Sequence, residues 1–180
     1  DYSGGEEVSR RVLAQSVSKE PIDQIVLIGR KPLPPNTIID DGSNVVSVTD
    51  QRCFITPIYL EKGISSYFGY RSFDGAFHTG VDMPAAYGTP IYAAMSGIVV
   101  EAGSSGSSYG TVVKILHPNG LYTYYAHLSA ITVRVGDSVS QNQMIGNIGT
   151  TGYATGPHVH FEVRLSDGET QVDPLEYLIG

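Results

Sequence analysis

The chain has 180 residues, which is enough for one full domain and a smaller module. Only 16% of the residues are charged, whereas glycine (21 residues) and tyrosine (12 residues) are abundant. This composition favours a β-rich fold with many turns over a helical bundle. The net charge is −7 and the basic residues are scattered, so the sequence has no basic stripe and nucleic acid is not an expected partner.

Cys53 is the only cysteine, which excludes an intrachain disulfide and a cysteine-based zinc ribbon. We expect it to be a small buried apolar residue. No apolar run approaches the roughly 18 residues that span a membrane, so no transmembrane segment is predicted in this chain. Residues 1–7 do not have the pattern of a signal peptide.

Residues 1–30 predict a partial N-terminal β module. Two β-rich runs within residues 8–29 flank Lys19-Glu20-Pro21 and predict a small hairpin. A two-stranded hairpin is only marginally stable alone, so we expect it to be the remnant of a larger module. The segment EEVSRRVLAQSVSKEPIDQIVLIG resembles the C-terminal end of the "G-five" domain, which is found beside wall hydrolases in Gram-positive bacteria.

Residues 31–52 predict a linker that contains proline and glycine. The run Lys31-Pro32-Leu33-Pro34-Pro35-Asn36 marks the boundary, because proline favours extended backbone and is excluded from central strands. The polar turn residues that follow, up to about Gln51, indicate linker or a loose edge strand. The main domain is therefore predicted at residues 53–180.

The main domain contains short apolar or alternating runs separated by turn residues, a pattern that predicts a mainly β fold, an antiparallel sandwich or open barrel. Pro118-Asn119-Gly120, between two of the predicted strands, is typical of a hairpin turn. Only the tail, Pro174–Leu178, predicts a helical turn. The predicted strands are the short runs between glycine-centred breaks: Ile91–Ala94, Gly97–Ala102, Thr111–Leu116, Tyr122–His127, Ile131–Val135, Met144–Gly149 and His158–Leu165.

Three histidine-containing elements carry the chemistry. His158 and His160 are two residues apart in a predicted strand, so both rings face the same side; by itself this pattern also fits two chance surface histidines. His78 and Asp82, with Gly80 between them, offer one nitrogen and one oxygen ligand, although the same residue pattern also occurs in ordinary surface turns. His127 ends a strand rich in tyrosine, where a packed histidine is the ordinary interpretation.

Taken together, the elements predict a metal centre. His78, Asp82 and one of His158 or His160 give the three protein ligands of a catalytic zinc, with an open position for water. The remaining histidines are then available for proton transfer or oxyanion stabilisation. The sequence shows no nucleophile elbow, no phosphate-cradling loop and no His-Glu-x-x-His helix. His117, beside a turn proline, is given no role.

Residues 53–178 resemble a lysostaphin-type (LytM-like) zinc metalloendopeptidase domain. The similar segments are ISSYFGYR, FHTGVDM, YGTPIYAAMSGIVVEAG, YYAHLS, VGDSV, IGNIGTTGYATGPHVHFEVR and VDPLEYL. The resemblance implies a groove on one sheet with Zn²⁺ bound by His78, Asp82 and His160. It also implies that His127 and His158 line the groove and assist catalysis without binding metal. One departure is Asn142, where the family usually has glycine; asparagine tolerates a positive φ.

The resemblance implies an endopeptidase that hydrolyses peptide bonds in bacterial cell-wall peptidoglycan. The partners are then peptidoglycan peptides, the enzyme is expected to be a monomer, and the location is extracellular or at the cell wall, with any signal or anchor upstream. Two alternatives are a non-catalytic relative that activates other hydrolases and a wall-binding protein that acts through its N-terminal module.

Further residues are candidates to shape or support the site. Glu162, two residues beyond His160 on the same face, is a candidate to support a ligand from behind. The resemblance also implies that the Gly103–Tyr109 loop and the segment before His78 shape the groove. Four tyrosines are candidates to line it, although sheet packing is their ordinary role: Tyr122, Tyr124, Tyr125 and Tyr153.

Overall fold

The computed structural model describes residues 52–72 and 75–179, together with the backbone of four short strands before them. β1 (Tyr2–Ser3) pairs with β2 (Glu6–Glu7). β3 (Thr37–Asp40) and β4 (Val45–Val48) form an antiparallel pair inside the segment predicted as linker. The hairpin predicted within residues 8–29, and most of the G-five-like segment, lie outside the described residues.

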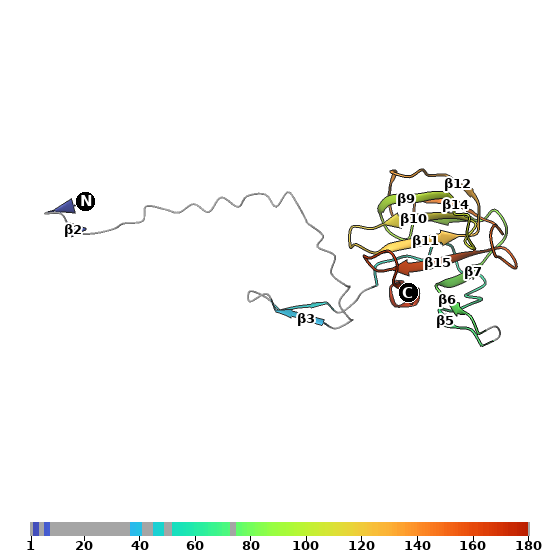
Figure 1. Cartoon of the computed structure of the whole chain (residues 1–180), viewed down its shortest axis with the longest axis horizontal. Helices are drawn as coiled ribbons and strands as arrows, with labels where there is room; N and C mark the ends of the chain where they lie inside the picture. Colours follow the sequence, from blue (N-terminus) through green and yellow to red (C-terminus); the bar gives the residue numbers. More distant parts are fainter. Residues whose placement is uncertain are drawn as a thin grey trace.

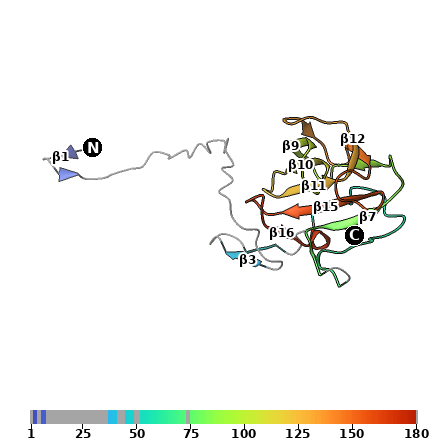
Figure 2. The same cartoon turned by 45° about the vertical axis from the view of Figure 1, so that its right-hand side comes forward.

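The domain is built on a large antiparallel sheet (Figure 1). β15 lies inside this sheet, between β11 on one side and β16 and β7 on the other (Figure 2). The sheet has the order β13 (Ser138–Val139), β9 (Gly97–Ser104), β10 (Thr111–Leu116), β11 (Tyr122–Ala126), β15 (His158–Arg164) and β16 (Gln171–Val172), and β7 (Val81–Pro84) also pairs with β15.

Smaller elements complete the domain. A second antiparallel sheet has the order β12 (Leu128–Ile131), β14 (Met144–Ile148) and β8 (Pro90–Tyr92). β5 (Gly69–Tyr70) pairs with β6 (Phe77–His78), and η1 (Pro174–Glu176) is a single 3-10 turn. The mainly β, antiparallel fold predicted from the sequence is confirmed.

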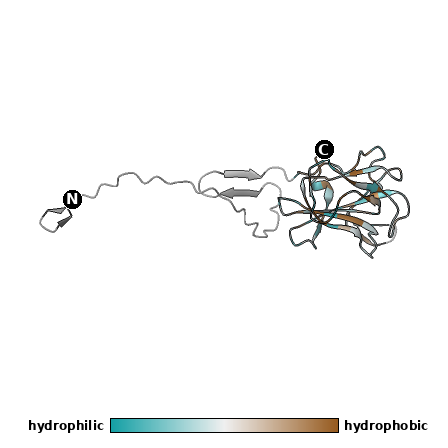
Figure 3. Cartoon of the chain, turned by 90° about the horizontal axis from the view of Figure 1, so that it is seen from above, coloured by the Kyte–Doolittle hydropathy of each residue, from teal (hydrophilic) through white to brown (hydrophobic). Residues whose placement is uncertain are grey.

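Alternation along β15 separates the core from the groove. Val159, Phe161 and Val163 belong to the hydrophobic core, whereas His158 and His160 project to the opposite face. Figure 3 shows hydrophobic and hydrophilic segments interleaved within the domain, as this alternation requires. Further fully buried core residues come from both sheets and from the N-terminal segment of the domain: Phe54, Val81, Met83, Ile91, Val113, Ile115, Tyr125, Leu128, Ile145 and Ile148.

Most predicted strands are present, and one is wrong. β10 has the predicted bounds, and it joins β11 through a turn in which the Gly120 N–H donates to the His117 carbonyl. The predicted strand Ile131–Val135 ends at Ile131, because Arg134 and Asp137 close a turn: the Arg134 N–H donates to Asp137 Oδ2 at 2.8 Å. Asn142 has φ 64°, as its place in a turn predicts.

The two ends of the domain meet. Phe54 forms an isolated parallel bridge with Leu178, and η1 is capped by Asp173, whose carboxylate accepts from the Leu175 N–H. Cys53 is only partly buried against the core, whereas the sequence predicts full burial. None of the helical turns in the described part of the chain has the length and apolar character needed to cross a membrane.

Candidate active site

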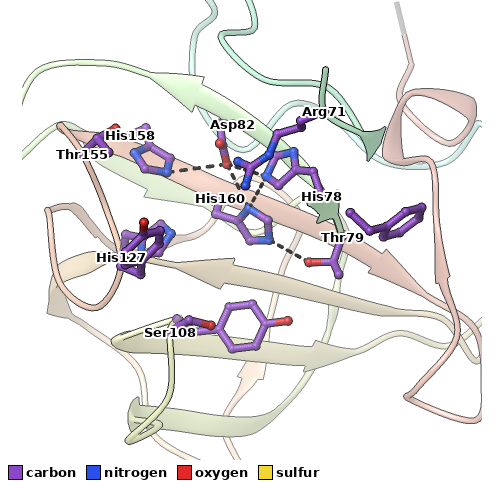
Figure 4. A pocket seen from close by; sticks show the side chains of 12 residues that line it. Arg71, His78, Thr79, Asp82, Ser108, His127, Thr155, His158 and His160 are labelled. Carbon is purple, nitrogen blue, oxygen red and sulfur yellow. Dashed lines mark hydrogen bonds and ion pairs between the residues drawn. The ribbon is translucent and has the colours of Figure 1, made fainter. Parts of the chain in front are cut away.

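Three strands bring the predicted metal ligands together. His78 ends β6, Asp82 lies in β7 and His160 lies in β15, directly opposite Asp82 in the β7–β15 register. Gly80 allows this approach, because a Cβ at its position would lie 2.3 Å from the Phe161 carbonyl oxygen. Figure 4 shows the three side chains pointing toward one another.

The three donor atoms have the spacing of a closed ligand set. His78 Nε2 lies 3.1 Å from Asp82 Oδ1 and 3.0 Å from His160 Nδ1, and the last two atoms are 2.9 Å apart. Tetrahedral zinc with ligands at about 2.0–2.1 Å places neighbouring donors about 3.3 Å apart. The nitrogen and oxygen donors present therefore fit a zinc ion after a shift of a few tenths of an ångström.

Each of the two histidines expected to bind metal is held through the ring nitrogen that does not face the other expected ligands. His78 Nδ1 lies 2.9 Å from the Tyr67 carbonyl oxygen, which only accepts, so Nδ1 carries the proton and Nε2 has its lone pair free. His160 Nε2 lies 2.9 Å from Glu162 Oε1, so its Nδ1 is the nitrogen that faces Asp82. The support expected of Glu162 is thus present as a contact.

His127 and His158 stand beside the ligand set. Their rings are 4.7 Å apart between centroids, and His158 Nε2 lies 3.5 Å from Asp82 Oδ1. The Nδ1 atoms are anchored at 2.8 Å on the carbonyl oxygens of Thr151 and Gly156, respectively. Both rings therefore keep Nε2 for other partners, close to the three donors (Figure 4).

His127 reaches this face only because the strand breaks there. Simple alternation places it on the same side as Tyr125, which is buried in the core. Instead β11 ends at Ala126 and His127 has φ 64°, which turns its ring to within 5.9 Å of the His160 ring. The structure places this candidate residue beside the other candidates in the cavity, on the face opposite to the one that simple alternation predicts.

A cavity of about 300 Å³ opens over these residues. The exposed Tyr153 lines it, as predicted, and so do Ser108 and Tyr109 of the loop expected to shape the groove. Tyr125 does not, because it is fully buried and its hydroxyl accepts from the Ala94 N–H. The cavity is lined by Arg71, Phe77, His78, Thr79, Asp82, Ser108, Tyr109, His127, Tyr153, Thr155, His158 and His160.

The other two candidate tyrosines, Tyr122 and Tyr124, are not among the lining residues. Tyr124 instead packs under the Arg164 guanidinium, 4.3 Å from its ring centroid. Arg71 and Phe77 come from the segment before His78, which is expected to shape the groove. Thr79 and Thr155 have no signal in the sequence, because only the fold brings them to the cavity.

Burial and the neighbouring charges set the protonation of the site. Burial alone would raise the pKa of Asp82, but hydrogen bonds from His160 and His78 outweigh it and hold the pKa well below its usual range. Burial opposes a charge on His160, yet its bonds to Asp82 and Glu162 raise its pKa to about 9. Burial lowers the pKa of His127 to about 4, so that ring is neutral at pH 7.

His117 lies apart from this cavity. Its side chain is buried, with Nδ1 2.9 Å from the Ser96 carbonyl oxygen and Nε2 2.7 Å from Thr123 Oγ1. Both ring nitrogens are used inside the fold.

Residues 76–174 match the model of peptidase family M23. Among curated proteins, the chain is 44% identical over 116 residues to the DD-carboxypeptidase/endopeptidase Mpg of Neisseria meningitidis, covering 62% of this chain and 26% of Mpg. It is 34% identical over 167 residues to the peptidoglycan DD-endopeptidase ShyC of Vibrio cholerae, covering 82% of this chain and 38% of ShyC. The chain thus spans well under half of either relative.

Two solved structures share the fold. The catalytic domain of the antimicrobial peptidase lysostaphin from Staphylococcus simulans superposes with a TM-score of 0.57 and 39% identity, covering 61% of this chain and 85% of that one. A zinc-containing peptidase from Vibrio cholerae superposes with a TM-score of 0.58 and 30% identity, covering 68% of this chain and 39% of that one.

Proposed function

Because this chain belongs to peptidase family M23, we propose that it is a zinc-dependent endopeptidase that hydrolyses peptide bonds in bacterial cell-wall peptidoglycan. The observation that carries the proposal is the meeting of three metal donors and two further imidazoles in one cavity. The names of ShyC and Mpg, both endopeptidases, support the substrate class. The proposed place of action is outside the cell, at the wall.

His78, Asp82 and His160 would hold the zinc ion, through Nε2, Oδ1 and Nδ1. When bound there, zinc supplies a Lewis acid that polarises the scissile carbonyl and lowers the pKa of a water molecule. The donor set is of the type that zinc prefers, and three protein ligands leave a position open. The zinc-containing structural neighbour supports the choice of metal.

His127 and His158 are proposed to handle the proton and the oxyanion. With Nδ1 donating to a backbone carbonyl, the neutral ring offers the Nε2 lone pair to the attacking water. Once protonated, the same nitrogen becomes a donor to the oxyanion of the tetrahedral intermediate or to the leaving amine. The low pKa of His127, about 4 because of burial, keeps it in the neutral form that accepts a proton.

Incubation with purified peptidoglycan tests the proposal. We expect new free amines, without new reducing sugar ends, and loss of this activity after treatment with a chelator, with recovery on addition of Zn²⁺. Mass spectrometry of fragments released from walls with glycine bridges and from walls with direct cross-links would identify the bond. Reducing ends without amines would contradict the proposal, and so would binding to walls without release of either product.

A further inference from the structure

Glu162 is a carboxylate placed where carboxylates are costly. Its side chain in β15 is completely buried, and an ionised carboxylate in such a place needs several hydrogen-bond and charge partners to be tolerated. It lies two residues beyond His160, on the face that carries the metal donors. No step of the proposed hydrolysis uses it.

Donors from four side chains converge on Glu162. Oε1 accepts from His160 Nε2 at 2.9 Å, from the Tyr109 hydroxyl at 2.8 Å and from Thr79 Oγ1. Oε2 accepts from Nε and Nη2 of Arg164, each at 2.7 Å. The two oxygens thus have separate tasks: one faces the metal ligand and its neighbours, and the other neutralises a guanidinium.

The bond to Glu162 decides which nitrogen of His160 faces the other ligands. The Glu162 carboxylate only accepts, so Nε2 keeps its proton, and Nδ1, which faces Asp82 and His78, is the nitrogen that would give up its proton and bind a metal. His158, on the same strand face, is anchored in the opposite sense, through Nδ1 to the Gly156 carbonyl. The neighbouring rings therefore present different nitrogens to the cavity.

We propose that Glu162 is a positioning residue of the metal centre, which holds His160 as the Nε2–H tautomer so that Nδ1 is available as a ligand. Arg164 supplies the counter-charge, and Tyr109 connects the assembly to the loop that lines the cavity. The inference rests on the proposed zinc site but not on the proposed substrate. Hydrogen-bonded partners of ligand histidines typically affect metal affinity by about 10–100-fold.

Glu162→Gln is the sharpest variant, because an amide keeps the shape but has one acceptor oxygen instead of two. Arg164 cannot give up a proton, so we expect it to retain the oxygen, which turns the amide NH₂ toward His160 Nε2. That arrangement favours the Nδ1–H tautomer and blocks the ligand atom. We expect the zinc affinity, measured by competition with a chromophoric chelator, to fall about 10–100-fold.

The matched control is Glu101→Gln. Glu101 also pairs with a basic group, Lys114 Nζ at 2.7 Å, but it lies on β9 away from the cavity. We expect unchanged zinc affinity there. Nitrogen-15 NMR of the histidine rings in the zinc-loaded proteins gives an independent readout: the wild type should show His160 protonated at Nε2 and bound through Nδ1, and Glu162→Gln should lose this signature.

A double variant, Glu162→Gln with Arg164→Met, removes the buried positive charge if the single variant unfolds. It should fold and still bind zinc weakly. Wild-type zinc affinity and an unchanged nitrogen-15 signature of His160 in a folded Glu162 variant would overturn the proposal. Misfolding of both variants would also overturn it, because the role of Glu162 would then be purely structural. Tight zinc binding without any peptidoglycan cleavage in the wild type would count against the proposed function and leave the role of Glu162 intact.

Discussion

His158 and His160 are two residues apart on one strand face, yet their environments differ. His160 is held between two carboxylates, whereas His158 is held by a backbone carbonyl and lies farther from Asp82, at 3.5 Å instead of 2.9 Å. The sequence alone leaves either histidine open as the third ligand, and only the family resemblance selects His160. The hydrogen bonds now give a physical reason for that choice.

Separate roles for the histidines predict separable losses. His158→Ala and His127→Asn should keep zinc but lower turnover about 10²–10³-fold, because each removes one proton-transfer or oxyanion group. Asparagine is the suitable replacement for His127, since it tolerates the φ of 64° found there. His160→Ala should lose zinc affinity as well as rate. Elemental analysis and amine release measure the two properties on the same samples.

A zinc-free His158→Ala protein beside a zinc-loaded His160→Ala protein would reverse the ligand assignment. Near-normal activity in both His158→Ala and His127→Asn would contradict the proposed mechanism.

Zinc binding should depend steeply on pH. In the metal-free protein burial disfavours a charged His160, but its bonds to Asp82 and Glu162 prevail and raise its pKa to about 9. Below that pH a proton must leave the ring before zinc binds, so the zinc Kd should fall about tenfold for each pH unit gained up to about 9. Titration calorimetry in buffers of different ionisation enthalpy would count the released protons; no released proton at pH 7 would contradict the prediction.

At the scale of elements, the site depends on how closely β6 and β7 approach β15. Gly80 lies between His78 and Asp82, where a Cβ would meet the Phe161 carbonyl oxygen at 2.3 Å and Glu162 Cγ at 2.9 Å. Gly80 thus lies between His78 and Asp82 in the sequence, and its close packing against β15 brings both side chains to His160. A bulkier residue would push β7 away from the strand that carries His160.

Gly80→Ala should therefore lower the free energy of unfolding by about 1–3 kcal/mol, the usual range for overpacking, and weaken zinc binding at the same time. Denaturant unfolding and chelator competition measure the two effects. Gly156→Ala is the matched control, because a Cβ there meets nothing within 4 Å and no left-handed φ is required. Equal stability of the two variants would show that the β7–β15 contact can yield without cost.

At the scale of the whole molecule, His117 makes the stability of the fold depend on pH, although it lies outside the candidate site. Burial lowers its pKa to about 4, against only a partial opposing effect of its bond to the Ser96 carbonyl. The unfolded chain takes up this proton near pH 6.5. The contribution of His117 to the free energy of unfolding is thus fully present above pH 6.5 and is lost as the pH falls toward 4.

His117→Gln should flatten that dependence. We expect the wild type to lose more unfolding free energy than the variant between pH 7 and pH 4.5, by on the order of 2–3 kcal/mol, since one pKa unit corresponds to about 1.4 kcal/mol. Denaturant unfolding at both pH values gives the difference, and His127, which titrates in the same direction, contributes equally to both proteins. Parallel pH profiles of the two proteins would contradict the prediction, because they would show that folding leaves the pKa of His117 unchanged.

The amino-acid sequence was sufficient to predict the strand-rich fold, the hairpin at Pro118-Asn119-Gly120 and the histidine and aspartate donors of the candidate metal site. These follow from local rules: period-two alternation, turn chemistry, and the preference of zinc for nitrogen and oxygen donors. The false strand at Ile131–Val135 shows the limit of such rules, because alternation continues through a turn that Arg134 and Asp137 close by a side-chain bond.

The assembly of the site depends on the folded domain. The fold placed His160 opposite Asp82 across two strands far apart in sequence, and it turned His127 out of its strand through a positive φ. It also gathered Tyr109, Thr79 and Arg164 around Glu162, which no spacing in the sequence predicts. The physical reason is that these contacts depend on strand register and close backbone approach, which are set by the packing of the whole domain.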